Sequence, residues 1–220
     1  MTKKKTVLVI AHGDLDGVVS AALEMKRSGL SVAETQVIFT QPFLIDKIVI
    51  PESIEKIFVV DIAVNNRDPE MTKRFIEQIR DKNRLVAWYD HHEGWEKVLG
   101  TGMGQTFDNG FFIDPMSRSC AGLIDPGNEE FVVWVADANA SDTREGELSE
   151  RGQLVEQAMK ANLSNDSIRE AAVRWILNGS KEDGDYQKLR EAQEKYQKVQ
   201  TMTEELVEQY EIHNGVAVVD

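Results

Sequence analysis

The feature that most restricts the fold of this chain is the segment TVLVIA at residues 6–11, an unbroken run of aliphatic and β-branched side chains. A run without polar alternation is typical of a strand that is buried on both faces of a parallel sheet. Residues 18–26 follow with helical spacing. A strand followed by a helix favours a right-handed crossover to the next parallel strand. The opening of the sequence therefore predicts an α/β fold.

The same alternation continues along the first half of the chain. Further strands are predicted at residues 35–40, 56–60 and 85–89, and an amphipathic helix is predicted at residues 69–79. After about residue 117 the pattern becomes mainly helical, with helices predicted at 117–124, 129–139, 147–161 and 166–178. We therefore expect a Rossmann-like open parallel sheet with flanking helices, followed by a helical region.

The last part of the sequence predicts one long connector helix. Apolar residues recur at helical spacing between residues 185 and 210, at Tyr186, Leu189, Tyr196, Val199, Met202, Leu206 and Tyr210. At 1.5 Å per residue such a helix is about 40 Å long, and we expect its apolar stripe to pack on the domain or on a partner chain, as in a homodimer. Asn214 and Gly215 then favour a turn before a short strand. The expected parts are an α/β domain at 1–145, a helical extension of it at 146–184, and the connector helix with the start of a further domain at 185–220.

The charge and composition of the chain limit the classes of partner that it is expected to bind. There are 38 Asp and Glu residues against 25 Lys and Arg, which gives a formal net charge of −13. Because affinity for long nucleic acids comes mainly from cationic side chains that displace counterions, long DNA or RNA is not the expected partner. No apolar stretch approaches the roughly 18 residues of a membrane span, and the single cysteine, Cys120, excludes an internal disulfide. We therefore expect a cytoplasmic protein without a membrane partner.

Acidic and histidine side chains follow three of the four predicted strands. They are His12, Asp14 and Asp16 after the first strand, Asp61 after the third, and Asp90, His91 and His92 after the fourth. Because the carboxyl ends of parallel strands meet at one edge of a sheet, these side chains are expected to converge. Converging carboxylates repel one another unless a cation compensates them. Carboxylates and imidazoles without cysteine suit Mn²⁺, Mg²⁺, Fe²⁺ or Zn²⁺, and about six ligands favour two ions.

In their order along the chain, these residues resemble the motifs of the DHH phosphoesterases. The matching segments are HGDLDGVVSA at 12–21, Asp61, DHH at 90–92 and SRSCA at 117–121. That family includes RecJ nucleases, oligoribonucleases of the NrnA type, cyclic dinucleotide hydrolases, exopolyphosphatases and type II inorganic pyrophosphatases. The resemblance covers residues 5–145. It implies a catalytic domain with two divalent metal ions, Mn²⁺ first, with Mg²⁺ or Co²⁺ as alternatives.

The resemblance implies metal ligands at five positions of the first three motifs. His12 and Asp14 are similar to ligands of one ion, and Asp16 is similar to a ligand of the second. Asp61 resembles the carboxylate that bridges both ions. His91 resembles a further ligand.

Other positions are expected to complete the site. The last ligand of the family follows an apolar helix, where Asp137 is our expectation and Asp142 is the alternative. His92 resembles the histidine that contacts the scissile phosphate, and Asp90 resembles the acid that orients its neighbours. The remaining candidate substrate contacts belong to the last motif and are Ser119 and Arg118.

A metal-dependent phosphoesterase is the function that the resemblance implies. A water activated between two cations would attack phosphorus, and the expected substrate is small, such as a short oligonucleotide or a cyclic dinucleotide. A RecJ-like single-strand exonuclease and a non-catalytic scaffold protein that keeps the fold are the alternatives. Many family members carry a second domain whose Gly-Gly-Gly-His motif holds the substrate, and this motif is absent from the sequence. We therefore expect either a fragment or a stand-alone catalytic domain.

Overall fold

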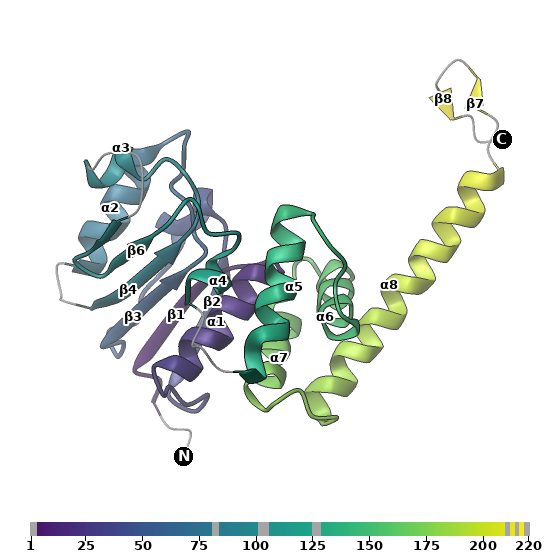
Figure 1. Ribbon diagram of the computed structural model, residues 1–220, viewed down its shortest axis with the longest axis horizontal. Helices are drawn as coiled ribbons and strands as arrows, with labels where there is room; N and C mark the ends of the chain where they lie inside the picture. The colour runs from purple at the N-terminus through teal and green to yellow at the C-terminus, as the bar shows by residue number, and fades with distance from the viewer. Residues whose placement is uncertain are drawn as a thin grey trace.

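A six-stranded sheet forms the centre of the molecule (Figure 1). The computed structural model describes residues 4–80, 84–100, 106–124, 129–209, 212–213 and 216–217. The strands of the sheet are β1 (Val7–His12), β2 (Thr35–Thr40), β3 (Lys56–Val60), β4 (Leu85–Asp90), β5 (Thr106–Asp108) and β6 (Phe111–Ile113). Their order is β2-β1-β3-β4-β6-β5, in which β5 pairs antiparallel with β6 at one edge and all other neighbours are parallel. The predicted Rossmann-like open sheet is thus confirmed.

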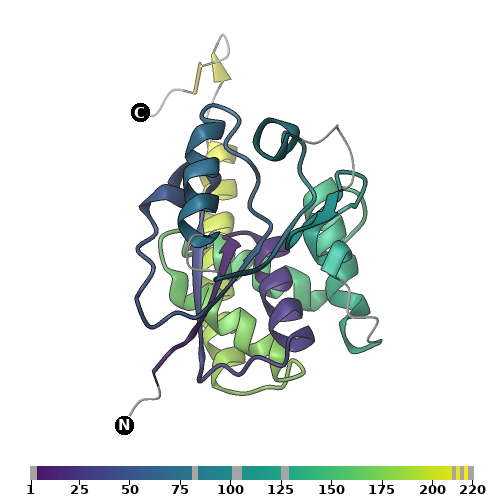
Figure 2. The same ribbon diagram turned by 90° about the vertical axis from the view of Figure 1, so that its left-hand side faces the viewer.

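Helices cover both faces of the sheet, as predicted (Figures 1 and 2). One face carries the 3-10 helix η1 (Pro42–Lys47), α2 (Pro69–Arg80) and α3 (Glu96–Leu99). The other face carries α1 (Leu15–Arg27), α4 (Cys120–Ile124), the 3-10 helix η2 (Glu129–Phe131), α5 (Val132–Thr143), α6 (Glu150–Lys160) and α7 (Asp166–Leu177). The sheet therefore separates two hydrophobic cores.

Strand β1 shows why the first segment of the sequence is apolar throughout. Val9 and Ala11 belong to the core that contains α1, whereas Leu8 and Ile10 belong to the core that contains α2. All four side chains are fully buried. Because β2 and β3 pair with the two sides of β1, these four residues meet water neither at the faces nor at the edges of the strand.

The register of the parallel strands brings their carboxyl ends to one edge of the sheet. His12, the last residue of β1, lies opposite Thr40 of β2. Val60, the last residue of β3, lies opposite Tyr89, the second-to-last residue of β4. Asp61, which follows β3, and Asp90, which ends β4, therefore reach the same edge as His12.

Helix α8 (Gly184–Gln209) leaves the body of the molecule partway along its length (Figure 1). Its inner half packs against α6 and α7 and buries Leu189 and Ala192. The apolar stripe continues along the outer half of the helix, where its side chains are exposed: Val199 is 62% exposed, Met202 is 61% exposed and Leu206 is 47% exposed. Two short strands, β7 (Ile212–His213) and β8 (Val216–Ala217), pair antiparallel beyond it, and the predicted turn at 214–215 lies outside the described residues. The homodimer expected through this helix stays a prediction.

The elements that the sequence patterns missed are all short. Strands β5 and β6, helix α3 and the 3-10 helix η1 span three to six residues each. A period of 2 or 3.6 residues cannot stand out in so few positions. In the described ranges we find no helix that combines the length and the hydropathy needed to span a lipid bilayer.

Candidate metal centre

A tight turn between β1 and α1 carries the first group of polar side chains. Asp14 caps α1 by accepting a hydrogen bond from the backbone N–H of Gly17, at 3.0 Å. Gly17 packs against the end of β1, where a Cβ would lie 2.3 Å from the carbonyl oxygen of His12. Only glycine fits this close approach of two backbones. The contact explains why the motif HGDLDG ends in glycine.

His12 directs its two ring nitrogens at different partners. Nδ1 lies 2.7 Å from Oδ2 of Asp14 and 3.9 Å from Oδ2 of Asp61. Nε2 lies 2.8 Å from Oε1 of Gln41, which directly follows β2. Burial lowers the pKa of His12, but the hydrogen bond to Asp14 and the charge of Asp14 outweigh it, so the pKa lies above its ordinary value. The ring is thus held between carboxylates on one side and an amide on the other.

Asp61 combines a strained backbone with a buried carboxylate, one oxygen of which forms no hydrogen bond with the described residues. Its φ of 57° lies in the left-handed region, which costs a residue other than glycine about 1–3 kcal/mol. The residue is 2% exposed, and Oδ1 has no hydrogen-bond partner among the described residues. Burial raises the pKa of Asp61 well above its ordinary value, and the charges of Asp16 and Asp14 raise it further. Such a carboxylate persists only where the surroundings hold it, which points to a functional role.

His91 brings an unpaired ring nitrogen to three carboxylates. Its Nδ1 lies 3.3 Å from the carbonyl oxygen of Ser117 and can donate to it. Nε2 is then an acceptor that lies 3.5 Å from Asp16, 3.5 Å from Oδ1 of Asp61 and 3.4 Å from Asp142. Within the described ranges, Nε2 forms no hydrogen bond. Acceptors therefore face one another here, an arrangement that a cation would compensate.

Asp90 is fully buried and holds His92 in place. Oδ1 of Asp90 accepts a hydrogen bond from Nδ1 of His92 at 2.8 Å, and Oδ2 accepts one from Nε1 of Trp95 at 2.6 Å. Burial lowers the pKa of His92, but the hydrogen bond to Asp90 and the charges of Asp90 and Asp142 raise it to about 9. These donors and the backbone N–H of His92 hold the Asp90 carboxylate, and the carboxylate holds the imidazole ring.

Asp16 contacts both the candidate site and helix α4. It is 1% exposed, and its two oxygens accept hydrogen bonds from the backbone N–H groups of Cys120 at 2.7 Å and Ala121 at 2.9 Å. Burial raises the pKa of Asp16 to about 6, although these backbone hydrogen bonds oppose the rise. The carboxylate therefore faces His91 and also holds the first turn of α4.

We expect Asp16→Ala to destabilise the protein far more than Asp14→Ala. The first change leaves the buried N–H groups of Cys120 and Ala121 without acceptors, at about 1–3 kcal/mol for each. The Asp14 side chain is 46% exposed, so water can replace it. Urea unfolding in EDTA, followed by circular dichroism, measures the free energy of unfolding of both variants. Equal losses would contradict the structural role of Asp16.

The two candidates for the last ligand lie in different places on α5. Asp142 lies 3.4 Å from Nε2 of His91. Asp137 instead accepts hydrogen bonds from the backbone N–H of Ser149 at 2.7 Å and from its Oγ at 2.6 Å, at the start of α6. Gly152 also packs on Asp137, where a Cβ would lie 2.6 Å from the carboxyl carbon. The structure therefore brings Asp142, and not Asp137, to the cluster of histidines and carboxylates.

The two candidate substrate contacts are engaged within the protein. Ser119 is buried, and its Oγ donates a hydrogen bond to Oδ1 of Asn139 at 2.7 Å. Arg118 is exposed and pairs with Glu145 at 3.2 Å. Their contacts with substrate stay predictions.

Two residues outside the predicted motifs hold the turn between β1 and α1. Gln41 contacts His12, and Arg169 of α7 donates a hydrogen bond from Nε to the carbonyl oxygen of Gly13 at 2.7 Å. Arg169 is 8% exposed, so little of its guanidinium meets solvent. Sequence periodicity carries no signal for either contact. The available signal for Gln41 was its position directly after a predicted strand, like the acidic motifs.

Overlapping groups of side chains in the described ranges have the geometry to hold a cation. The groups are His12, Asp14 and Asp61; Asp61, His91 and His92; and Asp16, His91 and Asp142. Within each group the ligand atoms lie within 4.8 Å of one another, and Asp61 and His91 each belong to two groups. Carboxylate oxygens and imidazole nitrogens suit divalent cations such as Mn²⁺. The unpaired Oδ1 of Asp61 and Nε2 of His91 fit such a cation.

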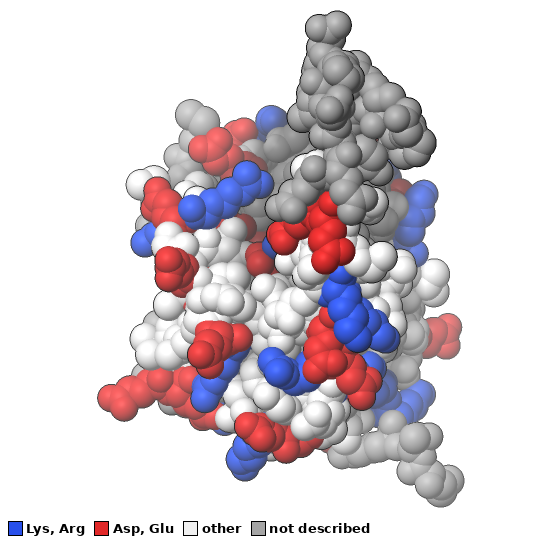
Figure 3. All heavy atoms as spheres, turned by 90° about the vertical axis from the view of Figure 1, so that its right-hand side faces the viewer, with Lys and Arg blue, Asp and Glu red and all other residues white. Residues whose placement is uncertain are grey.

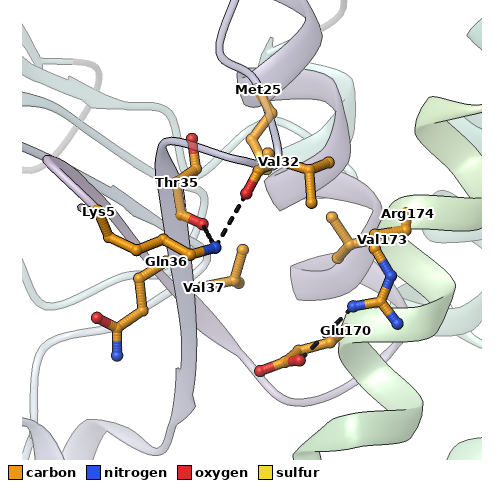
Figure 4. Close-up of a pocket in the computed structure, with 9 residues that line it drawn as sticks. All are labelled: Lys5, Met25, Val32, Thr35, Gln36, Val37, Glu170, Val173 and Arg174. Atoms are coloured by element: carbon orange, nitrogen blue, oxygen red, sulfur yellow. Dashed lines mark hydrogen bonds and ion pairs between the residues drawn. The ribbon is translucent and has the colours of Figure 1, made fainter. Parts of the chain in front are cut away.

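A separate cavity of about 270 Å³ opens at the amino end of the strands (Figure 4). Lys5 and Arg174 lie on its wall. Nζ of Lys5 donates to the carbonyl oxygens of Val32 and Thr35, and Arg174 is paired with Asp185. Both cationic groups are therefore already engaged. The cavity lies at the opposite end of the strands from the histidines.

Comparisons with known proteins identify the fold. The sequence matches no protein-family model and no curated protein. The structure is similar to a crystal structure of the exonuclease RecJ bound to manganese, with a TM-score of 0.57 and 12% identity over 94% of this chain. It is also similar to RecJ from Thermus thermophilus in complex with Mn²⁺, with a TM-score of 0.54 and 15% identity over 94% of this chain.

The similarity extends over nearly the whole chain but not over the whole of these proteins. The chain spans 64% of the length of the first RecJ structure and 37% of the second. RecJ nucleases are among the DHH phosphoesterases that the sequence motifs resemble, so structure and motifs point the same way. The chain therefore shares the fold of these two RecJ structures.

Proposed function

We propose that this protein is a divalent-metal-dependent phosphoesterase that hydrolyses a phosphodiester or phosphoanhydride bond in a small phosphorylated substrate. One observation carries the proposal: the buried Oδ1 of Asp61 and Nε2 of His91 lie 3.5 Å apart, and neither has a hydrogen-bond partner among the described residues. Two unpaired buried acceptors cost stability unless a cation lies between them. The fold supports the proposal, because both RecJ structures contain manganese.

Each candidate ligand has a proposed place in a two-cation centre. Asp61 has Oδ2 toward His12 and Oδ1 toward His91, so it is assigned to both cations. The other ligands are assigned to one cation each, His12 and Asp14 to the first, and Asp16, His91 and Asp142 to the second. When bound, a pair of divalent cations supplies Lewis acidity, which lowers the pKa of a water and neutralises charge on phosphoryl oxygens.

We assign His92 to the scissile phosphate and Asp90 to the orientation of His92. The side chain of His92 is 44% exposed, compared with 23% for His12 and 8% for His91, so it is the histidine of the cluster that a substrate meets first. Its Nδ1 is engaged by Asp90, which leaves the second ring nitrogen for a phosphoryl oxygen. A donor fixed in advance stabilises developing charge without reorganisation.

The charge of the protein favours a small substrate. The net charge is −13, and on the face in Figure 3 the described acidic and basic side chains are interspersed rather than gathered into a basic band. Because long nucleic acids need many cationic contacts, we place short oligonucleotides and cyclic dinucleotides first. A RecJ-like single-strand exonuclease is the second candidate, and the similarity to the RecJ fold is what favours it.

A hydrolysis assay with metal-stripped protein tests the proposal. Protein treated with EDTA is incubated with Mn²⁺, Mg²⁺ or Co²⁺ and with linear dinucleotides, cyclic dinucleotides, polyphosphate or long single-stranded DNA, and products are identified by mass spectrometry. We expect product from the short substrates with Mn²⁺ and none in EDTA. Cleavage of long DNA alone would favour the RecJ-like exonuclease. No product from any substrate, with Mn²⁺ bound, would favour a non-catalytic scaffold.

Asp142→Asn is expected to weaken Mn²⁺ binding, whereas Asp137→Asn is not. Asp142 lies beside the unpaired nitrogen of His91, and even changes outside the ligand shell of a metal cost about 10- to 100-fold in affinity. Asp137 holds Ser149 at the start of α6, so its substitution is expected to cost about 1 kcal/mol of stability instead. Titration of the free Mn²⁺ signal in electron paramagnetic resonance (EPR), together with urea unfolding, separates the two effects. The reverse pattern would return the assignment to Asp137.

A further inference from the structure

Gln41 contacts His12 through the ring nitrogen that the carboxylates do not use. We propose that Gln41 is a positioning residue that holds the His12 ring with Nδ1 turned toward the cation site. This inference rests on the proposed function, because it concerns how the chain prepares one of the proposed metal ligands.

The contact with Gln41 matters because it affects which ring nitrogen of His12 carries the proton. A neutral imidazole has one N–H and one lone pair, and a cation requires the lone pair of the nitrogen that binds it. Nδ1 of His12 lies 2.7 Å from Asp14 and 3.9 Å from Asp61, so Nδ1 is the nitrogen that faces the proposed cation site. When Nδ1 binds a cation, the proton of the neutral ring belongs on Nε2. The carboxamide oxygen of Gln41 lies 2.8 Å from Nε2 and accepts that hydrogen bond. Metal-binding histidines generally depend on such a partner for their tautomer and ring orientation.

The backbone holds Gln41 in this position without help from a metal. Its dihedral angles are extended, with φ −112° and ψ 153°. This is the region to which a residue before proline is restricted, and Pro42 follows. Thr40, the preceding residue, lies opposite His12 in the register of β2 and β1. Strand pairing and Pro42 therefore fix the backbone of Gln41 beside the imidazole, so little backbone entropy is left to lose when the contact forms.

Two substitutions distinguish a positioning role from simple packing. Gln41→Met keeps the length of the side chain and removes the acceptor, whereas Gln41→Glu keeps an acceptor oxygen. We expect the affinity for Mn²⁺ to fall about 10- to 100-fold in Gln41→Met and to be retained or increased in Gln41→Glu. Gln36→Met, on the same strand, is the matched control and is expected to leave the affinity unchanged. Gln41 is only partly buried, so the fold tolerates these changes.

The affinity is read from the EPR signal of free Mn²⁺, which requires no turnover. Thermal unfolding in EDTA shows that each variant is folded. Unchanged Mn²⁺ affinity in Gln41→Met, or equal losses in Gln41→Met and Gln41→Glu, would overturn the inference and leave the proposed function intact. If the unmodified protein bound no Mn²⁺, the proposed function would fail, and this inference with it.

Discussion

Asp61→Asn is expected to abolish hydrolysis and Mn²⁺ binding and, at the same time, to make the metal-free protein more stable. Asp61 is proposed to bind both cations, so one substitution removes a ligand from each. Because changes outside the ligand shell of a metal already cost about 10- to 100-fold, loss of this shared ligand is expected to lower kcat by more than about 100-fold.

The gain in stability follows from the surroundings of Asp61. The residue is 2% exposed, and burial together with the charges of Asp16 and Asp14 raises its pKa. An amide carries no charge to be repelled, and asparagine tolerates the left-handed φ of this position better than most residues do. We expect Tm in EDTA to rise by at least about 2 °C, the shift that 1 kcal/mol produces in a domain of this size.

Three measurements on one preparation check this expectation. They are calorimetry in EDTA, the EPR titration of Mn²⁺ and the dinucleotide assay. Asp46→Asn, at an exposed position of η1, is the control and is expected to change none of them. Full activity of Asp61→Asn, or a metal-free variant less stable than the unmodified protein, would contradict the assignment of Asp61.

Mn²⁺ is expected to raise the Tm of the unmodified protein by about 5–10 °C. A ligand that binds only the folded state adds about 2.7 kcal/mol at 100 times its Kd, and each kcal/mol shifts Tm by about 2–4 °C in a domain of this size. The physical origin is the relief of repulsion among Asp14, Asp16 and Asp61, which are gathered at one edge of the sheet. The shift therefore reports the same cluster that the hydrolysis assay probes.

Thermal scans with Mn²⁺, with Mg²⁺ and with EDTA measure this shift. EDTA is expected to reverse it, and Asp61→Asn is expected to lack it. A shift of equal size in Asp61→Asn would place the stabilising ion elsewhere on the protein. No shift in the unmodified protein at saturating Mn²⁺ would count against the metal centre as a whole.

The edge of the sheet where the site forms was predictable because buried parallel strands leave a clear pattern. In β1, alternate residues enter two different cores, so every position before His12 is apolar and the end of the strand is sharply marked. The topology then brings Asp61 and Asp90 to the same edge. The antiparallel strand β5 left no comparable pattern, because three residues are too few to show alternation.

The choice between Asp137 and Asp142 was beyond what periodicity can decide. The two residues are five positions apart on α5, about 140° around the helix axis at 3.6 residues per turn. A rotation of the helix that turns one toward the cluster turns the other away. Trp134 and Ala138 are buried on the same helix as Asp137, so the packing of α5 settles its rotation. That packing depends on distant segments, which the local sequence does not describe.

The contact made by Arg169 of α7 limits how far the chain can be shortened without loss of a hydrogen bond at the turn between β1 and α1. It lies 156 positions after Gly13, whose carbonyl oxygen it binds. A fragment that stopped at residue 145 would retain every proposed ligand, yet it would lack this donor and would expose the surface of α1 that α7 covers. During synthesis on a ribosome, the turn that carries His12 and Asp14 is therefore completed late. A piece of this protein that keeps every contact described for the proposed metal centre ends no earlier than Leu177, the last residue of α7.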